Sequence, residues 1–239
     1  MNPIQKLYPL VDKSKIIFCM DCPRKNIWRR TFYPEYKITR DLKDTSKDKF
    51  NINRMFKYAY DIILPTICEE YKAKKISSHS AEGDDVIAVL TKYFIETTKD
   101  DVIIISCDKD MVQLCSERVL LVTADGTIRE PKLELEHALK IKFDNSLEIT
   151  AKDFLLFKIL IGDSADNIPN VKPGVGPKKA WKYVADKKLL RELLSEDVTI
   201  ANGFLRNKKL ISMEEIPQKI HELIISEYLD NISEKSEVI

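Results

Sequence analysis

Acidic residues stand in three places where a predicted strand ends or a predicted helix begins. They are Asp21, the set Glu82, Asp84 and Asp85, and the pair Asp108 and Asp110. The carboxyl ends of parallel strands meet at one edge of a sheet, so these side chains are expected to converge there. Carboxylates brought together repel one another unless a cation neutralises them, and ligands that are all oxygen favour Mg²⁺ or Mn²⁺. The pattern predicts a divalent-metal site, although each acidic group taken singly would also suit the first turn of a helix.

A second group of residues is suited to holding a phosphate. Asp163 and Asp166 lie three residues apart and are followed by the turn Gly174-Val175-Gly176. Pro177 is well placed to open a helix, with Lys178 and Lys179 directly after it. Backbone N–H groups at such a turn can approach a phosphate at the helix N-terminus. The spacing is typical of a helix-hairpin-helix, which binds the nucleic-acid backbone without reading bases.

The elements that would position these residues follow from the apolar pattern. Short apolar runs predict strands near 15–20, 75–78, 101–106 and 118–123, with those at 15–20 and 101–106 buried. Helical spacing predicts helices over 50–71, where Pro65 should kink or shorten the helix, and over 81–97, with Ser80 as N-cap. Residues 22–49 are polar and basic and predict an exposed, partly helical excursion. Strands separated by helices indicate an α/β layer with a mostly parallel sheet.

Beyond Thr150 the pattern is helical to the end, which places a domain boundary near 145–149. The predicted domains are therefore an α/β metal-binding domain over 1–147 and a helical DNA-binding domain over 148–239.

Lys+Arg (39) and Asp+Glu (38) nearly cancel, but the segments 12–49 and 166–191 each carry a net charge of +5. Two basic regions thus flank an acidic middle, which suits a polyanionic partner held at two places.

The five cysteines are odd in number and lie mostly in apolar runs, so a disulfide framework is not expected. Cys19 and Cys22 have the spacing of half a zinc site, but no second half is present. The sequence lacks a long apolar run and a signal-peptide pattern. These features predict a soluble, intracellular (cytoplasmic) protein without membrane association.

Taken in order, the motifs resemble those of the 5′ nucleases of the flap endonuclease family, particularly their bacterial, phage and viral branch. The matching elements are Asp21 with Arg24, Tyr36-Lys37 with Arg40, Glu82-Gly-Asp-Asp85, Asp108-Lys-Asp110 with Gln113-Leu114, Gly162-Asp163 with Asp166-Asn-Ile-Pro169, and Gly174-Val-Gly-Pro-Lys178. They span about two thirds of the chain, and their ordered combination is more specific than any one of them. The resemblance implies a PIN-like (5′ nuclease) α/β fold followed by a helix-hairpin-helix (H3TH) subdomain.

The resemblance also implies roles for individual residues. Metal ligation would fall to Asp21, Glu82, Asp84, Asp85, Asp108, Asp110, Asp163 and Asp166. Lys37 and Arg40 would be catalytic residues that contact the scissile phosphate, from a gateway within an arch segment at about 22–50. Backbone binding of DNA would involve Arg24, Lys37, Arg40, Gly174, Val175, Gly176, Lys178 and Lys179.

The implied reaction is hydrolysis of a phosphodiester near a junction of single-stranded and duplex DNA, assisted by two Mg²⁺ or Mn²⁺ ions. A K⁺ ion at the hairpin is implied by some relatives. The expected substrates are DNA with 5′ flaps, nicks or RNA primers, the expected assembly is a monomer, and a replication protein is a further expected partner.

The match departs from the family at its start, where relatives carry a strand with a further metal-binding aspartate. Asp12 is a poor replacement because it lies too close to the next strand. Three interpretations follow: an incomplete chain, a split enzyme completed by a missing N-terminal polypeptide, or a catalytically impaired module that binds branched DNA. A PIN-like ribonuclease is a weaker alternative, because simple PIN domains lack the Gly174–Gly176 hairpin. The retained carboxylates favour a nuclease, since a pure binder gains nothing from holding like charges together.

Overall fold

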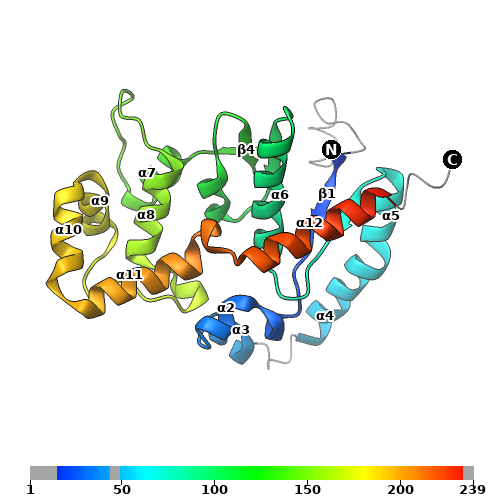
Figure 1. The fold of residues 1–239 in the computed structure, drawn as a ribbon, viewed down its shortest axis with the longest axis horizontal. Helices are drawn as coiled ribbons and strands as arrows, with labels where there is room; N and C mark the ends of the chain where they lie inside the picture. The colour runs from blue at the N-terminus through cyan, green and yellow to red at the C-terminus, as the bar shows by residue number, and fades with distance from the viewer. Residues whose placement is uncertain (1–14, 44–48, 234–239) are drawn as a thin grey trace. The chain divides into compact units, whose positions relative to one another are not determined.

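The computed structural model describes residues 15–43 and 49–233, and the chain folds into two compact units (Figure 1). Unit 1 comprises Met1–Val89 with Gln218–Ile239, and unit 2 comprises Leu90–Pro217. Asp12 and residues 44–48 of the predicted arch lie outside the described residues.

Unit 1 contains a small parallel sheet. Strand β1 (Ile17–Cys19) pairs with β2 (Lys74–Ile76), with Ile17 beside Lys74. The predicted strand at 15–20 is therefore present, but its side chains are only half-buried, which differs from the buried strand expected. The final helix α12 (Gln218–Ser233) packs against β2, so the two ends of the described chain belong to the same unit.

The polar segment after β1 is less exposed than its composition predicts. It forms η3 (Arg24–Asn26), α2 (Trp28–Phe32) and α3 (Ile38–Lys43). Six of its residues, including two cations, are buried: Cys22, Ile27, Trp28, Arg29, Tyr36 and Lys37. The expectation of an exposed excursion was wrong for this part, because buried carboxylates elsewhere in unit 1 attract the cations.

The predicted helix at 50–71 is present but differs in two respects. It runs as α4 (Lys49–Tyr58), a π-helical turn (Ala59–Ile63) and α5 (Leu64–Glu70). Pro65 has no N–H to donate to the carbonyl four residues earlier, and the wider π turn directly before it lets the helix continue without ending. Several of the apolar residues whose helical spacing predicted this helix are exposed, namely Met55, Tyr58, Ile62 and Ile63.

Helix α6 (Gly83–Thr97) carries the second acidic group at its first turn. Val86, Val89 and Leu90 are buried as their spacing predicts. The helix begins later than expected, at Gly83 rather than at Ala81, and the Asp85 carboxylate accepts a hydrogen bond from the Glu82 N–H at 3.0 Å. Asp85, and not Ser80, thus satisfies a free backbone donor at this end.

Unit 2 begins its sheet with β3 (Val102–Ile105), which pairs in parallel with β4 (Val119–Val122). A short strand β5 (Ile128–Arg129) adds antiparallel to β4. The strands are joined by η5 (Lys109–Leu114) and followed by α7 (Pro131–Leu139). The mostly parallel α/β layer is confirmed, although β3 is buried at Ile104 only.

The rest of unit 2 is helical, as predicted beyond Thr150. Its elements are α8 (Ala151–Ile161), η6 (Ser164–Asp166), α9 (Pro177–Ala185), α10 (Lys187–Glu196), α11 (Val198–Ile211) and η7 (Met213–Glu215). Thr150 and Asp153 form a reciprocal capping box at the start of α8. The predicted boundary at 147 differs from the division between the units, because α8 packs on α7 and η5 across it while α12 returns to unit 1.

Candidate metal and nucleic-acid site

Two predicted ligands in unit 2 converge on one cation. The Lys158 ammonium lies 2.9 Å from Asp110 Oδ1 and 2.9 Å from Asp163 Oδ2. Asp110 is on η5, Asp163 precedes η6, and Lys158 is on α8, so three separate elements bring these groups together. The sequence predicted both carboxylates as metal ligands but gave no role to Lys158.

Burial and charge act in opposite directions on this group. Burial raises the pKa of the Asp110 carboxyl, and the Lys158 ammonium only partly offsets it. Burial acts in the same direction on Asp163, but Lys158 and the N–H groups of Ala165 and Asp166 hold its pKa below the usual range. Burial acts to lower the pKa of Lys158, yet the two carboxylates raise it above its ordinary value. The three groups are therefore held in a part-buried contact in which one ammonium faces two carboxylates and offsets only part of their charge.

The backbone around these carboxylates is shaped by local side-chain bonds. Asp108 accepts a hydrogen bond from the Asp110 N–H at 2.8 Å and caps η5. Asp163 accepts one from the Ala165 N–H at 2.9 Å and caps η6. Gly162, just before Asp163, has φ +69°, and a Cβ there would lie 2.4 Å from the Ile168 carbonyl oxygen. Only glycine fits, so this residue fixes the loop that presents Asp163.

In unit 1, Asp21 lies at the start of α6. Its Oδ1 accepts a hydrogen bond from the Gly83 N–H at 2.7 Å. A Cβ at Gly83 would lie 3.2 Å from the Cys19 carbonyl oxygen and 3.3 Å from Asp21 Oδ1, so glycine permits this close approach. Asp21 is exposed and Asp84 is half-buried, which leaves both carboxylates available to solvent.

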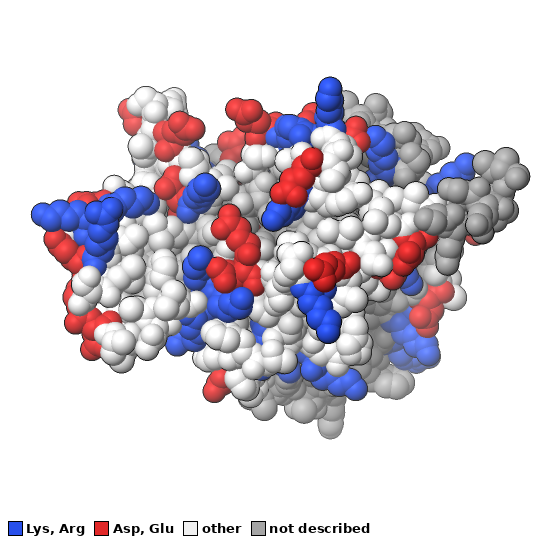
Figure 2. All heavy atoms as spheres, viewed as in Figure 1, with Lys and Arg blue, Asp and Glu red and all other residues white. Residues whose placement is uncertain are grey.

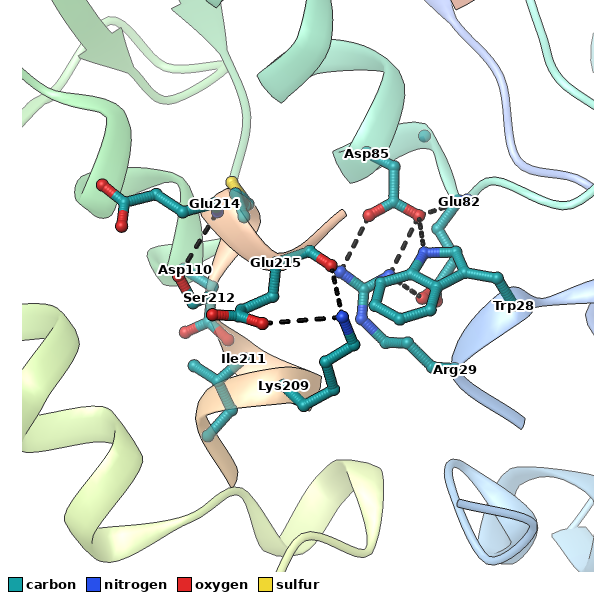
Figure 3. Close-up of polar contacts among 12 residues, drawn as sticks. Trp28, Arg29, Glu82, Asp85, Asp110, Lys209, Ile211, Ser212, Glu214 and Glu215 are labelled. Carbon is teal, nitrogen blue, oxygen red and sulfur yellow. Dashed lines mark hydrogen bonds and ion pairs between the residues drawn. The ribbon is translucent and has the colours of Figure 1, made fainter. Parts of the chain in front are cut away.

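Glu82 and Asp85 have a different environment from the other predicted ligands. Asp85 is fully buried, and its Oδ1 lies 2.8 Å from Arg29 Nη2. Trp28 Nε1 donates to Asp85 Oδ2 at 3.0 Å, and Arg29 also contacts Glu82 at 3.1 Å. Figure 3 shows the Trp28 and Arg29 side chains directed at the two carboxylates. These acids are thus neutralised by the protein itself.

Lys37 also points into this cluster. Its ammonium forms an ion pair with Glu82, and the Tyr36 hydroxyl donates to the same carboxylate at 3.1 Å. Lys37 is 8% exposed, whereas Arg40 is exposed and Arg24 half-buried. Of the predicted gateway residues, Arg40 is therefore open to solvent and Lys37 is held by Glu82.

The predicted hairpin forms in unit 2 as its glycines require. Gly174 has φ +81°, and α9 begins at Pro177 as expected. A cavity of about 420 Å³ beside the turn is lined by Ala138, Leu139, Lys140, Gly174, Gly176, Pro177, Lys178 and Lys179. Lys178 and Lys179 are exposed, and Val175 is buried beneath the turn. Lys140, at the end of α7, is a further cation beside the hairpin that sequence reasoning missed.

Basic residues extend beyond the turn itself. The exposed cations of α9 and α10 are Lys178, Lys179, Lys182, Lys187, Lys188 and Arg191. Figure 2 shows several Lys and Arg side chains, with Asp and Glu among them, where Figure 1 draws these helices. This surface of unit 2 suits a phosphate backbone.

The predicted ligands are divided between the units, with Asp21, Glu82, Asp84 and Asp85 in unit 1 and Asp108, Asp110, Asp163 and Asp166 in unit 2. Over residues 15–43 and 49–233, no three His, Cys, Asp or Glu side chains are grouped so that they could hold a metal ion. The residues nevertheless fit a cation, because the Lys158 ammonium occupies a point on which Asp110 and Asp163 converge. Their oxygen-only donor set is the kind that suits a divalent ion of the Mg²⁺ type.

Two solved structures similar to this chain are of bacteriophage T5 proteins. The T5 5′-exonuclease with bound divalent metal ions (zinc) has a TM-score of 0.71 at 19% identity, covering 95% of this chain and 89% of that one. The T5 flap endonuclease in a pseudo-enzyme-product complex with DNA and metal ions also has a TM-score of 0.71 at 19% identity, covering 96% and 89%. The chain therefore has the fold of these 5′ nucleases.

The family described as 5′-3′ exonuclease, N-terminal resolvase-like domain, matches residues 1–143, and the chain belongs to this family. A 5′-3′ exonuclease of Buchnera aphidicola subsp. Schizaphis graminum is 34% identical over 180 residues, 75% of this chain and 54% of that protein. DNA polymerase I of Bacillus subtilis is 31% identical over 150 residues, 61% of this chain and 16% of that protein. The chain thus spans about half the length of the Buchnera relative.

In the part that the structure describes, no helix is both long and apolar enough to cross a membrane.

Proposed function

We propose that this protein is a structure-specific 5′ nuclease, a 5′-3′ exonuclease or flap endonuclease that hydrolyses phosphodiesters near junctions of single-stranded and duplex DNA. The observation that carries the proposal is the convergence of Asp110 and Asp163, from separate elements, on the Lys158 ammonium. Like charges brought together need cations beside them, and Lys158 supplies one positive charge for two carboxylates, which leaves a negative charge for a metal ion to offset. Family membership and the exposed hairpin lysines support the same function.

The residues that would hold the divalent ions, two of Mg²⁺ or Mn²⁺, are the predicted carboxylates. Asp21, Asp84, Asp108, Asp110, Asp163 and Asp166 are the better candidates, because Glu82 and Asp85 are buried and paired with Arg29 and Lys37, whereas Asp110 and Asp163 share a single ammonium. When bound, such ions lower the pKa of a coordinated water and offset charge on the phosphate. The substrates would be 5′ flaps, nicks and RNA primers on DNA, acted on in the cytoplasm or a viral replication compartment.

The chain's own residues would act on the substrate by charge and position. Arg40 is exposed and would attract the phosphate next to the cleaved bond, while Lys37 would leave Glu82 to share that charge. The Gly174–Lys179 hairpin would hold the duplex backbone through its N–H groups and lysines, with a K⁺ ion as a further ligand of the turn. No protein nucleophile is needed for this reaction.

The test is cleavage of 5′-flap, nicked and single-stranded DNA by the purified protein with Mg²⁺ or Mn²⁺. Cleavage near the junction is expected, and Asp108→Asn should abolish it. Asp125→Asn is the matched control, because Asp125 sits in an exposed turn outside the cluster. Equal rates for the parent and Asp108→Asn would refute the site assignment.

A second candidate function is a DNA-binding module without catalysis, and one observation favours it. Lys158 already places a positive charge between Asp110 and Asp163, so the protein itself offsets part of the repulsion between these carboxylates. Binding of flap DNA with no cleavage in Mg²⁺ or Mn²⁺ would support the module and exclude the nuclease.

A further inference from the structure

The backbone at Lys37 is in a conformation that needs support. Its φ is +57°, in the left-handed region that non-glycine residues seldom adopt. The Arg30 guanidinium donates to the Tyr36 carbonyl at 3.0 Å and to the Lys37 carbonyl at 3.3 Å. Such a residue costs on the order of 1–3 kcal/mol and persists only where neighbours fix it, often at functional sites. Arg30 is the neighbour that fixes it here.

The side chain of Lys37 is fixed by a second arginine, acting through a carboxylate. Glu82 receives the Lys37 ammonium, and the same carboxylate lies 3.1 Å from Arg29 Nη1. Arg29 is 4% exposed and also lies 2.8 Å from Asp85 Oδ1. Its charged fork therefore clamps Glu82 and Asp85 in one geometry, as Figure 3 shows.

Arginine is suited to this task where lysine is not. A guanidinium presents several N–H groups in a rigid plane and can hold two carboxylates at once, while an ammonium acts as a point charge. The acids raise the pKa of Arg29 above its ordinary value in spite of burial, so its charge is permanent. Trp28, the residue before it, adds a hydrogen bond to Asp85 at 3.0 Å.

We propose that helix α2 (Trp28–Phe32) positions Lys37 for its contact with the substrate phosphate. Arg30 holds the backbone of residue 37, and Arg29 holds Glu82, which receives the ammonium until DNA arrives. Arg29 and Arg30 are positioning residues, since neither needs to touch the substrate. The inference rests on the proposed nuclease function and assigns α2 a role within it.

The first test is a double-mutant cycle on a 5′-flap substrate. Arg29→Lys and Arg30→Lys should each lower kcat by about 10- to 100-fold, as expected for a misplaced reacting group, with KM nearly unchanged. In a Lys37→Ala background neither change should lower kcat further, because the group being positioned is gone. Additive losses in that background would overturn the proposal.

A matched control separates positioning from general support of the fold. Arg118 likewise donates to backbone carbonyls, those of Ile95 at 3.1 Å and Thr98 at 3.0 Å, but belongs to unit 2. Arg118→Lys should lower Tm without lowering the kcat of the folded protein. If the parent does not cleave, or if Lys37→Ala cleaves as fast as the parent, the proposed function fails instead, so the two failures are distinguishable.

A second test needs no catalysis and covers variants that lose stability. Acetic anhydride and mass spectrometry would compare the acetylation rate of Lys37 with that of exposed Lys25. In the parent Lys37 should react much more slowly than Lys25, and in Arg29→Lys its rate should rise while that of Lys25 stays constant. An unchanged Lys37 rate in Arg29→Lys would overturn the proposal.

Discussion

Lys158 offsets part of the negative charge at a point where two carboxylates could bind a cation. Its ammonium is shared equally between Asp110 and Asp163, at 2.9 Å from each. A cation bound between those carboxylates would have to displace it. Lys158 therefore stabilises the fold and competes with metal at the same point.

Lys158→Met separates these two effects. Without metal, Asp110 and Asp163 lose their counter-ion, and the free energy of unfolding should fall by about 1–3 kcal/mol. With Mg²⁺ the variant should gain more stability than the parent, because no ammonium has to be displaced. Thermal unfolding in EDTA and in Mg²⁺ measures both.

The matched control is Lys142→Met. Lys142 also pairs with a carboxylate, Glu136 at 2.7 Å, but its side chain is 83% exposed. It should change neither the stability in EDTA nor the response to Mg²⁺ by much. An equal Mg²⁺ response in the parent and Lys158→Met would contradict the assignment of this point to a metal.

Two cysteines differ from a third in their expected reactivity. Burial raises the pKa of Cys19 to about 12 and that of Cys22 to about 11 from the ordinary value of 9.0, while Cys107 is exposed. At pH 8 iodoacetamide should modify Cys107 first, and Cys19 and Cys22 only after unfolding, because the thiolate is the reactive form.

These two buried thiols also predict that the folded state loses stability at alkaline pH. Because folding raises their pKa values, the stability they contribute is complete below pH 9.0 and is lost as pH rises from there through about 11 and 12. Rapid labelling of Cys22 in the folded protein at pH 8 would contradict the burial of its thiol and the raised pKa that follows from it.

At this scale the sequence predicted the acids better than their partners. Acidic residues after apolar runs are visible in one dimension, as Asp108 and Asp163 show. Lys158 left a weaker signal, a cation inside the apolar run of α8, which becomes meaningful only when η5 and η6 lie beside it. No pattern in the sequence indicated the role of Arg29, because its partners Glu82 and Asp85 are more than fifty residues away along the chain.

At the scale of elements, the loop between α8 and η6 depends on Gly162. Gly162→Ala should lower the free energy of unfolding by about 3 kcal/mol or more, because its Cβ would meet backbone oxygens of Ile168 and Pro169 at 2.4 and 2.5 Å. Urea unfolding measures the loss.

Gly126→Ala is the comparison for this change. Gly126 also has a positive φ of +92°, but nothing lies within 4 Å of its Cβ position. It should show the smaller cost of strain alone, about 1 kcal/mol. Equal losses at the two glycines would mean that strain, not the close packing at Gly162, determines the loop.

The hairpin before α9 can be tested by charge reversal. Lys178→Glu and Lys179→Glu should each weaken duplex DNA binding and reduce the slope of log Kd against log salt by about 1, the loss of one phosphate contact. Lys99→Glu, at an exposed position between α6 and β3, is the control for non-specific charge. If it weakens binding as much as Lys178→Glu, the basic surface acts diffusely and the hairpin has no special role.

Most elements were predictable, but their exposure was not. Apolar runs located β1, β2, β3 and β4 to within a few residues, and glycine and proline located the hairpin. The two-residue β5 carries too little pattern to detect. In α4 and the π-helical turn after it, Met55 and Ile62 recur at helical spacing yet are exposed, because spacing alone does not say whether another element covers that face.

At the scale of the molecule, the order of the chain and the division into units disagree. The sequence changes character near Thr150, which suggested two consecutive domains. In the structure α12 packs against β2, and Lys74 lies over the Tyr228 ring at 5.3 Å, so unit 1 is closed by the last helix. No local pattern in α12 identifies its partner, because many apolar faces could receive it.

Neighbouring residues of α12 test this organisation directly. Ile224 is 0% exposed and Leu223 is 46% exposed. Ile224→Ala should cost about 2–5 kcal/mol as a core truncation. Because unit 1 contains β1 and β2, hydrogen exchange should speed up at their shared bonds, the Met20 N–H to the Ile76 carbonyl and the Lys74 N–H to the Ile16 carbonyl.

Leu223→Ala should leave those amides unchanged, since it removes little buried surface. In both variants the unit 2 amides of Ile168 and Val171, which donate to the carbonyls of Asp163 and Leu160, should keep their protection. Faster exchange at Val171 in Ile224→Ala would mean that the two units unfold together, and it would join the carboxylates of unit 1 and the hairpin of unit 2 in one cooperative structure.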